Sequence, residues 1–318
     1  MRLALAVAAA TLATPALAEK IFVSNERDNT VTVLDGKTFE LLKTIPTGDR
    51  PRGIITSADG KLVYVAAGDD DALDVIDVAT LEVAKQFDSG PDPELLDVDH
   101  AGTRIYIANE DDALVTVMDS ATGETITQIP VGIEPEGMAV SPDDSIVVAT
   151  SESTGMAHFI DAATLELVAN TIVDTRPRHA EWQDDGARVW VTSEIGGTVS
   201  VLDGKSFERV DTIGFEIPGV GAELIQPVGL RFSADGKLAF VALGPSNRVA
   251  VIDTATLEVK KYILVGQRPW HMERSLDGTR MYVANGLTND MTIIDIASLE
   301  PVRSVPVGRL PWGVAVAP

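Results

Sequence analysis

The 318-residue chain contains no cysteine and only four histidines. Without cysteine no disulfide bond can form, so the stability of the folded chain must come from its buried core. A Cys-His nucleophile pair is excluded as well, and the sequence has neither a Gly-x-Ser-x-Gly motif nor a phosphate-binding loop. The sequence therefore offers no ready-made catalytic motif.

Positive charge is also scarce, because 25 lysines and arginines stand against 48 aspartates and glutamates. Such a balance argues against nucleic acid or an anionic bilayer as the main partner, since both would be repelled. A basic protein or a metal ion suits it better, although the charge could also serve solubility alone.

Only one apolar run stands out, and it lies at the N-terminus. Met1 to Ala18 has a basic start at Arg2, an apolar stretch from Leu3 to Ala10 and a small-residue end. This layout predicts a signal peptide over residues 1–18, cleaved after Ala18, and export to a bacterial periplasm. Cleavage would leave residues 19–318, with 24 basic against 48 acidic residues and a net charge of −24. No later run is long enough to predict a membrane span.

The rest of the chain repeats. An aspartate returns every 42 residues, with one interval of 50, at Asp35, Asp77, Asp119, Asp161, Asp203, Asp253 and Asp295. A proline column keeps the same spacing, at Pro51, Pro93, Pro135, Pro177, Pro227, Pro269 and Pro311. A period of about 40 to 45 residues is typical of β-propeller blades. The sequence therefore predicts an all-β, seven-bladed propeller over residues 19–318, with one insertion, 214–225, before Pro227.

Each repeat divides into four short strands, which residues 53–57, 62–66, 72–77 and 82–87 illustrate. Strands such as 62–66 are almost wholly apolar, so both faces of each antiparallel sheet must be covered by neighbouring blades. Residues 21–25 match a second strand and residues 313–317 a first strand. We therefore expect the two ends of the chain to close one shared blade. The aspartates are followed by Thr or Ser three positions on, which predicts turn hydrogen bonds rather than catalysis.

Runs such as Ile105 to Asn109, Met281 to Asn285 and Val63 to Ala67 resemble the motif of the YVTN-repeat family of seven-bladed β-propellers. Phe22 to Glu26 and Gly48 to Gly53 make the mature chain similar to the β-propeller proteins associated with PQQ-dependent catabolism. That resemblance implies an accessory to a periplasmic quinoprotein alcohol dehydrogenase or its cytochrome c. Propellers host many unrelated activities, so the resemblance is more specific for fold than for function.

Blades of one chain can be compared with each other, and positions where a column breaks are candidates for function. Two residues after each proline the chain reads Gly53, Leu95, Gly137, His179, Gly229, His271 and Gly313. The glycines predict a crowded position near the axis, where His179 and His271 would project at the channel mouth. Glu181 and Glu273 follow on the same side of each strand. His100, in a turn, and His158, in a strand, are interpreted as structural.

The positions just before and just after the repeated prolines also differ between blades. The predicted binding site comprises Arg50, Arg52, Arg176, Arg178, His179, Glu181, Arg268, Trp270, His271, Glu273 and Trp312. Arginines bind carboxylates, tryptophans stack on flat rings, and histidines form hydrogen bonds or bind metals, so a tricarboxylate quinone such as PQQ would suit this mouth chemically. The alternative is that arginines and glutamates of neighbouring blades pair with each other around the channel.

Acidic loops form a second feature of the same face, at Asp69 to Asp71 and Glu110 to Asp112, with Glu94, Glu134 and Glu136 nearby. They could hold calcium or a lanthanide, or steer a basic cytochrome, but they lack the order of a dedicated calcium loop, which favours a solvated face. The insertion carries Phe215, Ile217 and Val220, which we expect to favour a protein contact.

The sequence thus predicts a monomeric periplasmic protein that binds rather than catalyses, in the service of PQQ-dependent oxidation. The rival prediction is a metal-dependent lactonase-like hydrolase, in which His179, His271 and Glu181 or Glu273 form an axial site. A cell-envelope adhesion module is a third hypothesis, although only one propeller and no stalk are present.

Overall fold

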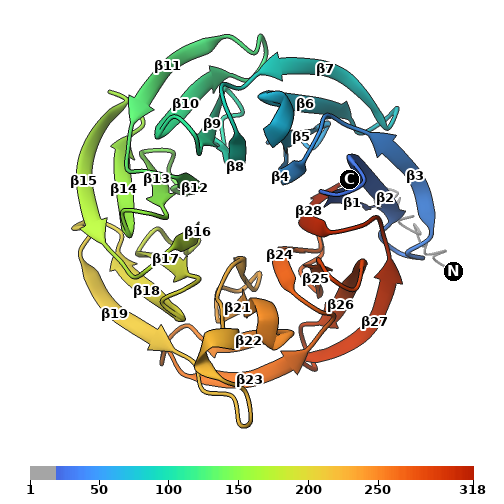
Figure 1. The fold of residues 1–318 in the computed structure, drawn as a ribbon, viewed down its shortest axis with the longest axis vertical. Coiled ribbons are helices and arrows are strands. Elements are labelled where there is room, and N and C mark those ends of the chain that lie inside the picture. The colour runs from blue at the N-terminus through green and yellow to red at the C-terminus, as the bar shows by residue number, and fades with distance from the viewer. Residues whose placement is uncertain (1–18) are drawn as a thin grey trace, which may run out of the picture.

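A computed structural model describes residues 19–318 and shows seven four-stranded antiparallel sheets arranged around a central axis (Figure 1). The predicted all-β seven-bladed propeller is therefore confirmed. The predicted signal peptide, residues 1–18, lies outside the described residues. None of the helices in the described part of the chain has the length and hydrophobicity of a membrane span.

In each blade the first strand lies nearest the axis and the fourth forms the rim (Figure 1). The innermost strands are β4 (Pro51–Thr56), β8 (Pro93–Val98), β12 (Pro135–Val140), β16 (Pro177–Trp182), β20 (Leu230–Phe232), β24 (Pro269–Arg274) and β28 (Pro311–Ala317). The second strands are β1 (Lys20–Asn25), β5 (Leu62–Ala67), β9 (Arg104–Asn109), β13 (Ile146–Ser151), β17 (Arg188–Ser193), β21 (Leu238–Ala242) and β25 (Arg280–Asn285).

The third strands are β2 (Thr30–Asp35), β6 (Ala72–Asp77), β10 (Leu114–Asp119), β14 (Met156–Asp161), β18 (Thr198–Asp203), β22 (Arg248–Asp253) and β26 (Asp290–Asp295). The outer strands are β3 (Leu41–Pro46), β7 (Glu82–Asp88), β11 (Thr125–Pro130), β15 (Glu166–Ile172), β19 (Arg209–Gly214), β23 (Val259–Leu264) and β27 (Glu300–Pro306). Helical structure within residues 19–318 is limited to three short 3-10 turns, η1 (Gly68–Asp70), η2 (Ala222–Leu224) and η3 (Gly244–Ser246).

The ring closes as predicted, because β28 supplies the innermost strand of the sheet whose other strands are β1, β2 and β3. Phe22 pairs with Ala315 and Lys20 with Ala317 across this junction. The closure leaves no unpaired inner edge at the point where the chain begins and ends. The seven aspartates end the third strands, and each accepts backbone hydrogen bonds from the turn that follows, as Asp77 does from Ala79 and Thr80.

The core lies between the blades. Clusters of buried apolar side chains join neighbouring sheets, and one of them combines β9 and β10 residues such as Tyr106 and Val117 with Val147 and Ala149 of β13. This arrangement explains why the second and third strands are apolar on both faces.

The innermost strands crowd each other near the axis, as the glycine column predicts. A Cβ on Gly53, Gly137 or Gly229 would lie within 3.0 Å of a backbone oxygen in the next blade. Glycine and a larger residue alternate around most of the ring, so each glycine gives room to its neighbour. Just after the proline, the pairing of β4 with β5 is irregular between Pro51 and Ile54, and most other blades repeat this bulge.

The insertion differs from expectation in one respect. Ile217 is buried, and Phe215 and Val220 pack against the same core cluster of their own blade. The chain itself therefore covers Ile217, which cannot contact another protein as expected, whereas Phe215 and Val220 are only partly buried and their expected contact stays a prediction. The innermost strand of this blade is also short: β20 begins at Leu230 rather than Pro227, and the N–H of Gly229 donates to Trp270 of the next blade instead.

We predict that Gly53→Ala lowers the free energy of unfolding by about 2 to 3 kcal/mol, because the new methyl group would press on the backbone at Glu94 and Leu95. Urea unfolding followed by tryptophan fluorescence measures the change. Gly214→Ala is the matched control, because nothing lies within 4 Å of its added Cβ, and its effect should stay within about 0.5 kcal/mol. Equal effects of the two substitutions would contradict the crowding at the axis.

Candidate functional site

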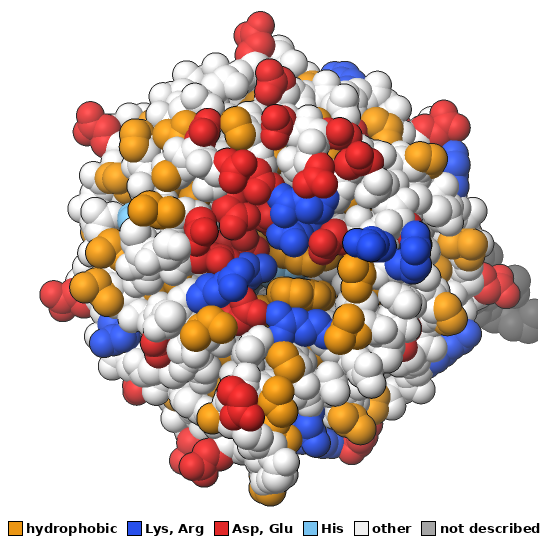
Figure 2. Space-filling model, in the orientation of Figure 1, with side chains coloured by type: hydrophobic (Ala, Val, Ile, Leu, Met, Phe, Trp, Pro, Cys, Tyr) orange, Lys and Arg blue, Asp and Glu red, His pale blue; other side chains and the backbone are white. Residues whose placement is uncertain are grey.

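The candidate site lies on one face of the disc, which we call the upper face. It carries the loops between second and third strands and those that lead into each innermost strand, and it faces the viewer in Figures 1 and 2. Acidic side chains gather beside the central depression over β8 and β12, with basic side chains around them (Figure 2). The five arginines Arg50, Arg52, Arg176, Arg178 and Arg268, with their carboxylate partners, are called the mouth.

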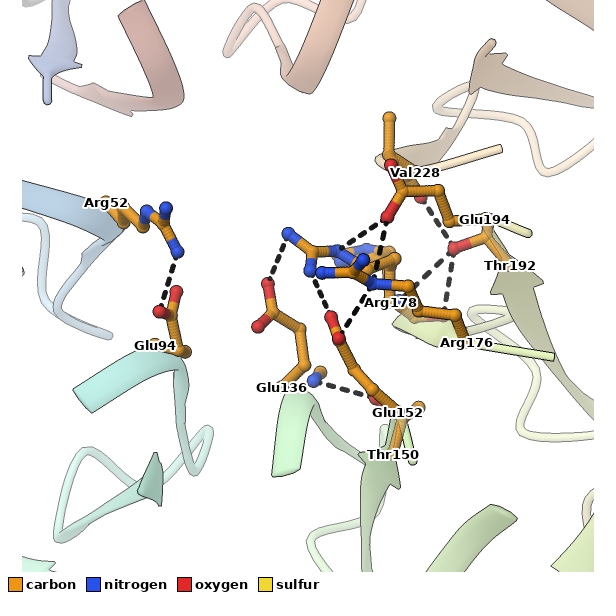
Figure 3. Close-up of polar contacts among 12 residues, drawn as sticks. Arg52, Glu94, Glu136, Thr150, Glu152, Arg176, Arg178, Thr192, Glu194 and Val228 are labelled. Atoms are coloured by element: carbon orange, nitrogen blue, oxygen red, sulfur yellow. Dashed lines mark hydrogen bonds and ion pairs between the residues drawn. The ribbon is translucent and has the colours of Figure 1, made fainter. Parts of the chain in front are cut away.

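Every arginine of the mouth pairs with carboxylates. Arg52 of β4 contacts Glu94 of β8 at 2.7 Å and Glu26 at 3.3 Å. Arg178 of β16 contacts Glu136 of β12 at 3.0 Å and also pairs with Glu152 (Figure 3). These pairs cross blade boundaries, so the alternative that the sequence left open, mutual pairing around the channel, is present in the structure.

The remaining arginines extend this network. Arg176 lies 2.8 Å from Glu152 and 3.3 Å from Glu194, and Arg268 lies 2.6 Å from Glu194. Arg50 lies 2.9 Å from Asp69 and 3.1 Å from Glu94, and it also pairs with Asp92. The carboxylates outnumber the arginines: those paired with an arginine are Glu26, Asp69, Asp92, Glu94, Glu136, Glu152 and Glu194, and the unpaired Glu110, which we include in the mouth, lies beside Asp92 and Glu94.

Several of these carboxylates are buried, and a buried carboxylate is costly to keep ionised. Glu94 and Glu136 are fully buried, and Arg178 is 4% exposed. Burial raises the pKa of Glu136 well above its ordinary value, and the neighbouring Glu94 and Glu152 add to the rise although Arg178 opposes it. Burial, and then the charge of Glu94, raise the pKa of Glu110 to about 7. Burial would lower the pKa of Arg178, but the surrounding glutamates outweigh it and keep the guanidinium charged.

The tryptophans of the predicted site are also engaged. The guanidinium of Arg268 lies 4.2 Å from the ring centre of Trp270, and that of Arg178 lies 5.6 Å from it. Trp312 is 1% exposed and its ring centre lies 4.1 Å from that of His271. Of the two rings, only part of Trp270 reaches solvent, because Trp312 belongs to the channel wall.

His179 and His271 lie deeper than predicted. They are 5% and 6% exposed, so neither ring projects into solvent at the mouth. Their ring centres lie 5.3 Å apart, although the two residues belong to blades on either side of the blade that contains β20. With Trp312 and Glu181 they border a cavity of about 50 Å³, which has room for one or two water molecules.

Glu181 and Glu273 belong to a separate cluster further down the channel, which we call the lower channel cluster. It consists of Asp97, Glu181, Arg231 and Glu273, and Arg231 lies 3.0 Å from Glu273 and pairs with Glu181. Cavities of about 400 and 280 Å³ lie beside this cluster and reach the loops that follow the innermost strands. The eleven residues of the predicted site are thus divided between the mouth and the channel.

The lower channel cluster holds three carboxyl groups against one arginine. Burial would raise the pKa of Glu181, but Arg231 and the contact with His179 lower it. Burial, followed by the charge of His179, holds the pKa of His271 well below its ordinary value, so this imidazole is neutral. Burial raises the pKa of Asp97 to about 6, although the backbone N–H groups of Val140 and Val98 and the charge of Arg231 oppose the rise.

Sequence reasoning missed Arg231 and Asp97. Both stand four residues after the proline column, where the blades read Ile55, Asp97, Ala139, Glu181, Arg231, Glu273 and Ala315. It also missed a column that follows the second strand of each blade, which reads Glu26, Gly68, Glu110, Glu152, Glu194, Gly244 and Gly286. The glycines of this second column leave room for Arg50, Arg268 and Trp270, whose side chains lie within 3.0 Å of the missing Cβ atoms. Both columns could have been found in the sequence by the same comparison of blades.

The two histidines interpreted as structural serve that role. His158 is buried in β14, where its Nδ1 lies 2.6 Å from Asn170 and its Nε2 accepts a hydrogen bond from Gly132. His100 lies in an exposed turn, 2.7 Å from Asp144.

Comparisons with known proteins agree with this architecture. Residues 2–98 match the family model described as YNCE-like beta-propeller, and residues 160–301 match the model described as lactonase, 7-bladed beta-propeller. The chain is thus similar to both families over different parts of its length. No curated protein matches it.

Solved structures share the fold at low identity. Hydrazine synthase of Kuenenia stuttgartiensis superimposes with a TM-score of 0.80 and 20% identity, covering 87% of this chain and 92% of that one. A putative 6-phosphogluconolactonase of Bacteroides fragilis gives 0.77 and 20%, covering 95% and 98%. The dihydro-heme d1 dehydrogenase NirN gives 0.69 and 19%, covering 93% and 74%. At these identities the likeness shows the fold alone.

Asp97 yields a prediction about pH. Because its pKa is raised to about 6, the folded chain keeps a proton between about pH 4 and 6 that the unfolded chain has lost. Its contribution to stability therefore falls as pH rises through this window. Asparagine cannot ionise, so the difference in unfolding free energy between Asp97→Asn and wild type should shift in favour of the variant from pH 4 to pH 7.

Urea unfolding at pH 4, 5, 6 and 7 measures this difference. The control is Asp59→Asn, since hydrogen bonds, first from Lys61, lower the pKa of Asp59 to about 2. The difference between this variant and wild type should change little above pH 5. If the Asp97→Asn difference were equally flat, Asp97 would be ionised in the folded chain throughout the range.

Proposed function

We propose that the chain is a non-catalytic binding protein that docks a basic protein partner on its upper face. The observation that carries the proposal is the surplus of carboxylates at the mouth, where every arginine is already paired. A surface of this kind attracts cationic groups and repels anions.

Acidic loops extend this surplus outward from the mouth. Asp69, Asp70, Asp71, Asp111 and Asp112 are all exposed in the loops that follow second strands, which lie on the upper face. Opposite charge across an interface mainly accelerates association and sets its dependence on salt. We therefore expect the affinity for a basic partner to fall as ionic strength rises.

Exposed apolar side chains at loop tips of the upper face offer a partner protein apolar surface to bury in addition to the charged groups. Ile133, Ile195 and Leu287 are 60%, 56% and 61% exposed, and Leu224 in η2 is 43% exposed. They stand in upper-face loops of four successive blades, away from the loops of Asp69 to Asp71 and Asp111 to Asp112. An apolar sector beside a charged one resembles the usual anatomy of a protein interface.

The partner class follows from the resemblance to proteins of PQQ-dependent catabolism. We propose a periplasmic c-type cytochrome or the quinoprotein dehydrogenase itself, bound by a monomeric, exported form of this chain. PQQ as the direct ligand is less favoured, because a tricarboxylate would have to displace glutamates from Arg52 or Arg178. Removing one partner from a buried ion pair typically costs about 3 to 5 kcal/mol.

We predict that Asp111→Asn combined with Asp112→Asn weakens binding of a basic c-type cytochrome at least about threefold at low salt, with a smaller effect at 0.5 M NaCl. Both side chains are exposed, and neither makes a hydrogen bond or ion pair among residues 19–318, so stability should not change. Titration calorimetry of residues 19–318 at 20, 150 and 500 mM NaCl measures the effect.

The control removes the same charge elsewhere. Glu166→Gln combined with Glu208→Gln changes two exposed acids at the outer strands and should leave the affinity within about 1.5-fold of wild type. Equal losses from the two pairs would mean that net charge, not the upper face, governs the interaction. Absence of binding to any basic cytochrome or to the dehydrogenase would overturn the proposal.

A lactonase-type hydrolase is the second candidate, and one observation favours it. The lactonase model matches residues 160–301, the part of the chain that carries His179, Glu181, His271 and Glu273. The cavity between the two histidines, about 50 Å³, is small for a sugar lactone. This candidate predicts a stoichiometric bound metal and turnover of a lactone panel, both lost in His179→Gln. Elemental analysis and a pH-indicator assay measure them, and docking of a cytochrome without turnover would exclude this candidate.

A further inference from the structure

Three carboxylates of one blade converge at the acidic side of the mouth. Asp92 lies in the loop before β8, Glu94 lies in β8, and Glu110 follows β9. The pairing of Pro93 with Asn109 brings the two strand ends together, and the N–H of Glu110 donates to the backbone oxygen of Asp92 at 3.0 Å. As a result, one carboxylate oxygen of each residue lies within 4.8 Å of the others.

The cluster is short of positive charge. Arg50 pairs with Asp92 and Glu94, and Arg52 pairs with Glu94. Glu110 has no ion-pair partner among residues 19–318, although it is only partly exposed. Three carboxylates at this spacing repel each other unless a cation or a proton lies between them.

A second observation also points to a bound cation. Glu94 is fully buried, and while its Oε1 accepts a hydrogen bond from Arg52, its Oε2 has no hydrogen-bond partner in the described chain. Glu136, on the next blade, is equally buried, and while its Oε1 pairs with Arg178 at 3.0 Å, its Oε2 has no partner in the described chain. Buried carboxylate oxygens without partners are rare, because each loses its hydration without compensation.

The ligand chemistry selects the kind of cation. All candidate ligands are carboxylate oxygens, which suit hard cations rather than zinc or copper. Calcium binds oxygens at about 2.3 to 2.6 Å, so two of its ligands can lie up to about 5 Å apart, whereas magnesium requires a tighter and more regular shell. The spacing within 4.8 Å accommodates calcium.

We propose that Asp92, Glu94 and Glu110 form a calcium site at the mouth of the channel. Arg50 and Arg52 contact Asp92 and Glu94 from outside and hold these carboxylates in place. Solvent completes the coordination shell, since Asp92 and Glu110 are partly exposed. The site is independent of the docking proposal, because it needs no partner protein.

The test uses purified residues 19–318 treated with EDTA and then titrated with CaCl2 in equilibrium dialysis. We expect one saturable calcium per chain and a rise in Tm of at least about 3 °C at saturating calcium. Glu110→Gln should weaken binding at least tenfold while the metal-free chain stays folded, because Glu110 makes no ion pair that the fold depends on. Asp92→Asn is the second variant and should weaken binding as well.

The matched control is Asp112→Asn, two residues from Glu110 in the same loop but exposed and outside the cluster. Its calcium affinity should stay within about twofold of wild type. Calcium binding that Glu110→Gln and Asp112→Asn weaken equally would mean diffuse attraction to an acidic face. No saturable binding up to 5 mM CaCl2, with Glu110 instead sharing a proton with Glu94, would also overturn the proposal.

Discussion

Crowding of the innermost strands at the axis is the constraint on which the rest of the structure depends. Seven strands meet around one channel, and glycine at Gly53, Gly137 and Gly229 lets the backbone of the next blade approach. The neighbours that fill the space between these glycines are Leu95, His179 and His271. Because the ring leaves so little room, any side chain that faces the axis either closes the channel or is held against its neighbours.

The charges of the mouth follow from that constraint. Arginines and glutamates brought together by neighbouring blades cannot turn away into solvent, so they pair across the blade boundaries, as Arg52 does with Glu94 and Arg178 with Glu136. Such buried pairs add little net stability, but breaking one is costly. They therefore fix the geometry of the mouth and leave the surplus carboxylates as its chemically available groups.

The repeat made the fold predictable, because every blade restates the same strand and turn signals. The breaks in the columns also located Arg50, Arg52, Arg178 and Arg268 at one opening. What the sequence could not show was the depth of each side chain, since depth depends on how side chains of different blades fill the channel, as where Trp312 packs on His271. His179 and Glu181 were therefore grouped with the mouth although they line the channel. Arg231 and Asp97 could have been found as well, because the position four residues after each proline also differs between blades.

Because the arginines of the mouth are already paired with carboxylates, the mouth favours cations over anions as ligands. An anion can bind Arg178 only by displacing Glu136 and Glu152 from it. The displaced glutamates would stay buried without a partner, and this cost would offset the binding free energy of the anion. A cation needs no such exchange, because Glu110 and the free oxygen of Glu94 are already unpaired. A basic protein surface and a calcium ion therefore draw on the same surplus, one across the exposed acidic loops and the other inside the mouth. The same ring geometry that neutralises the arginines thus favours positively charged ligands on this face.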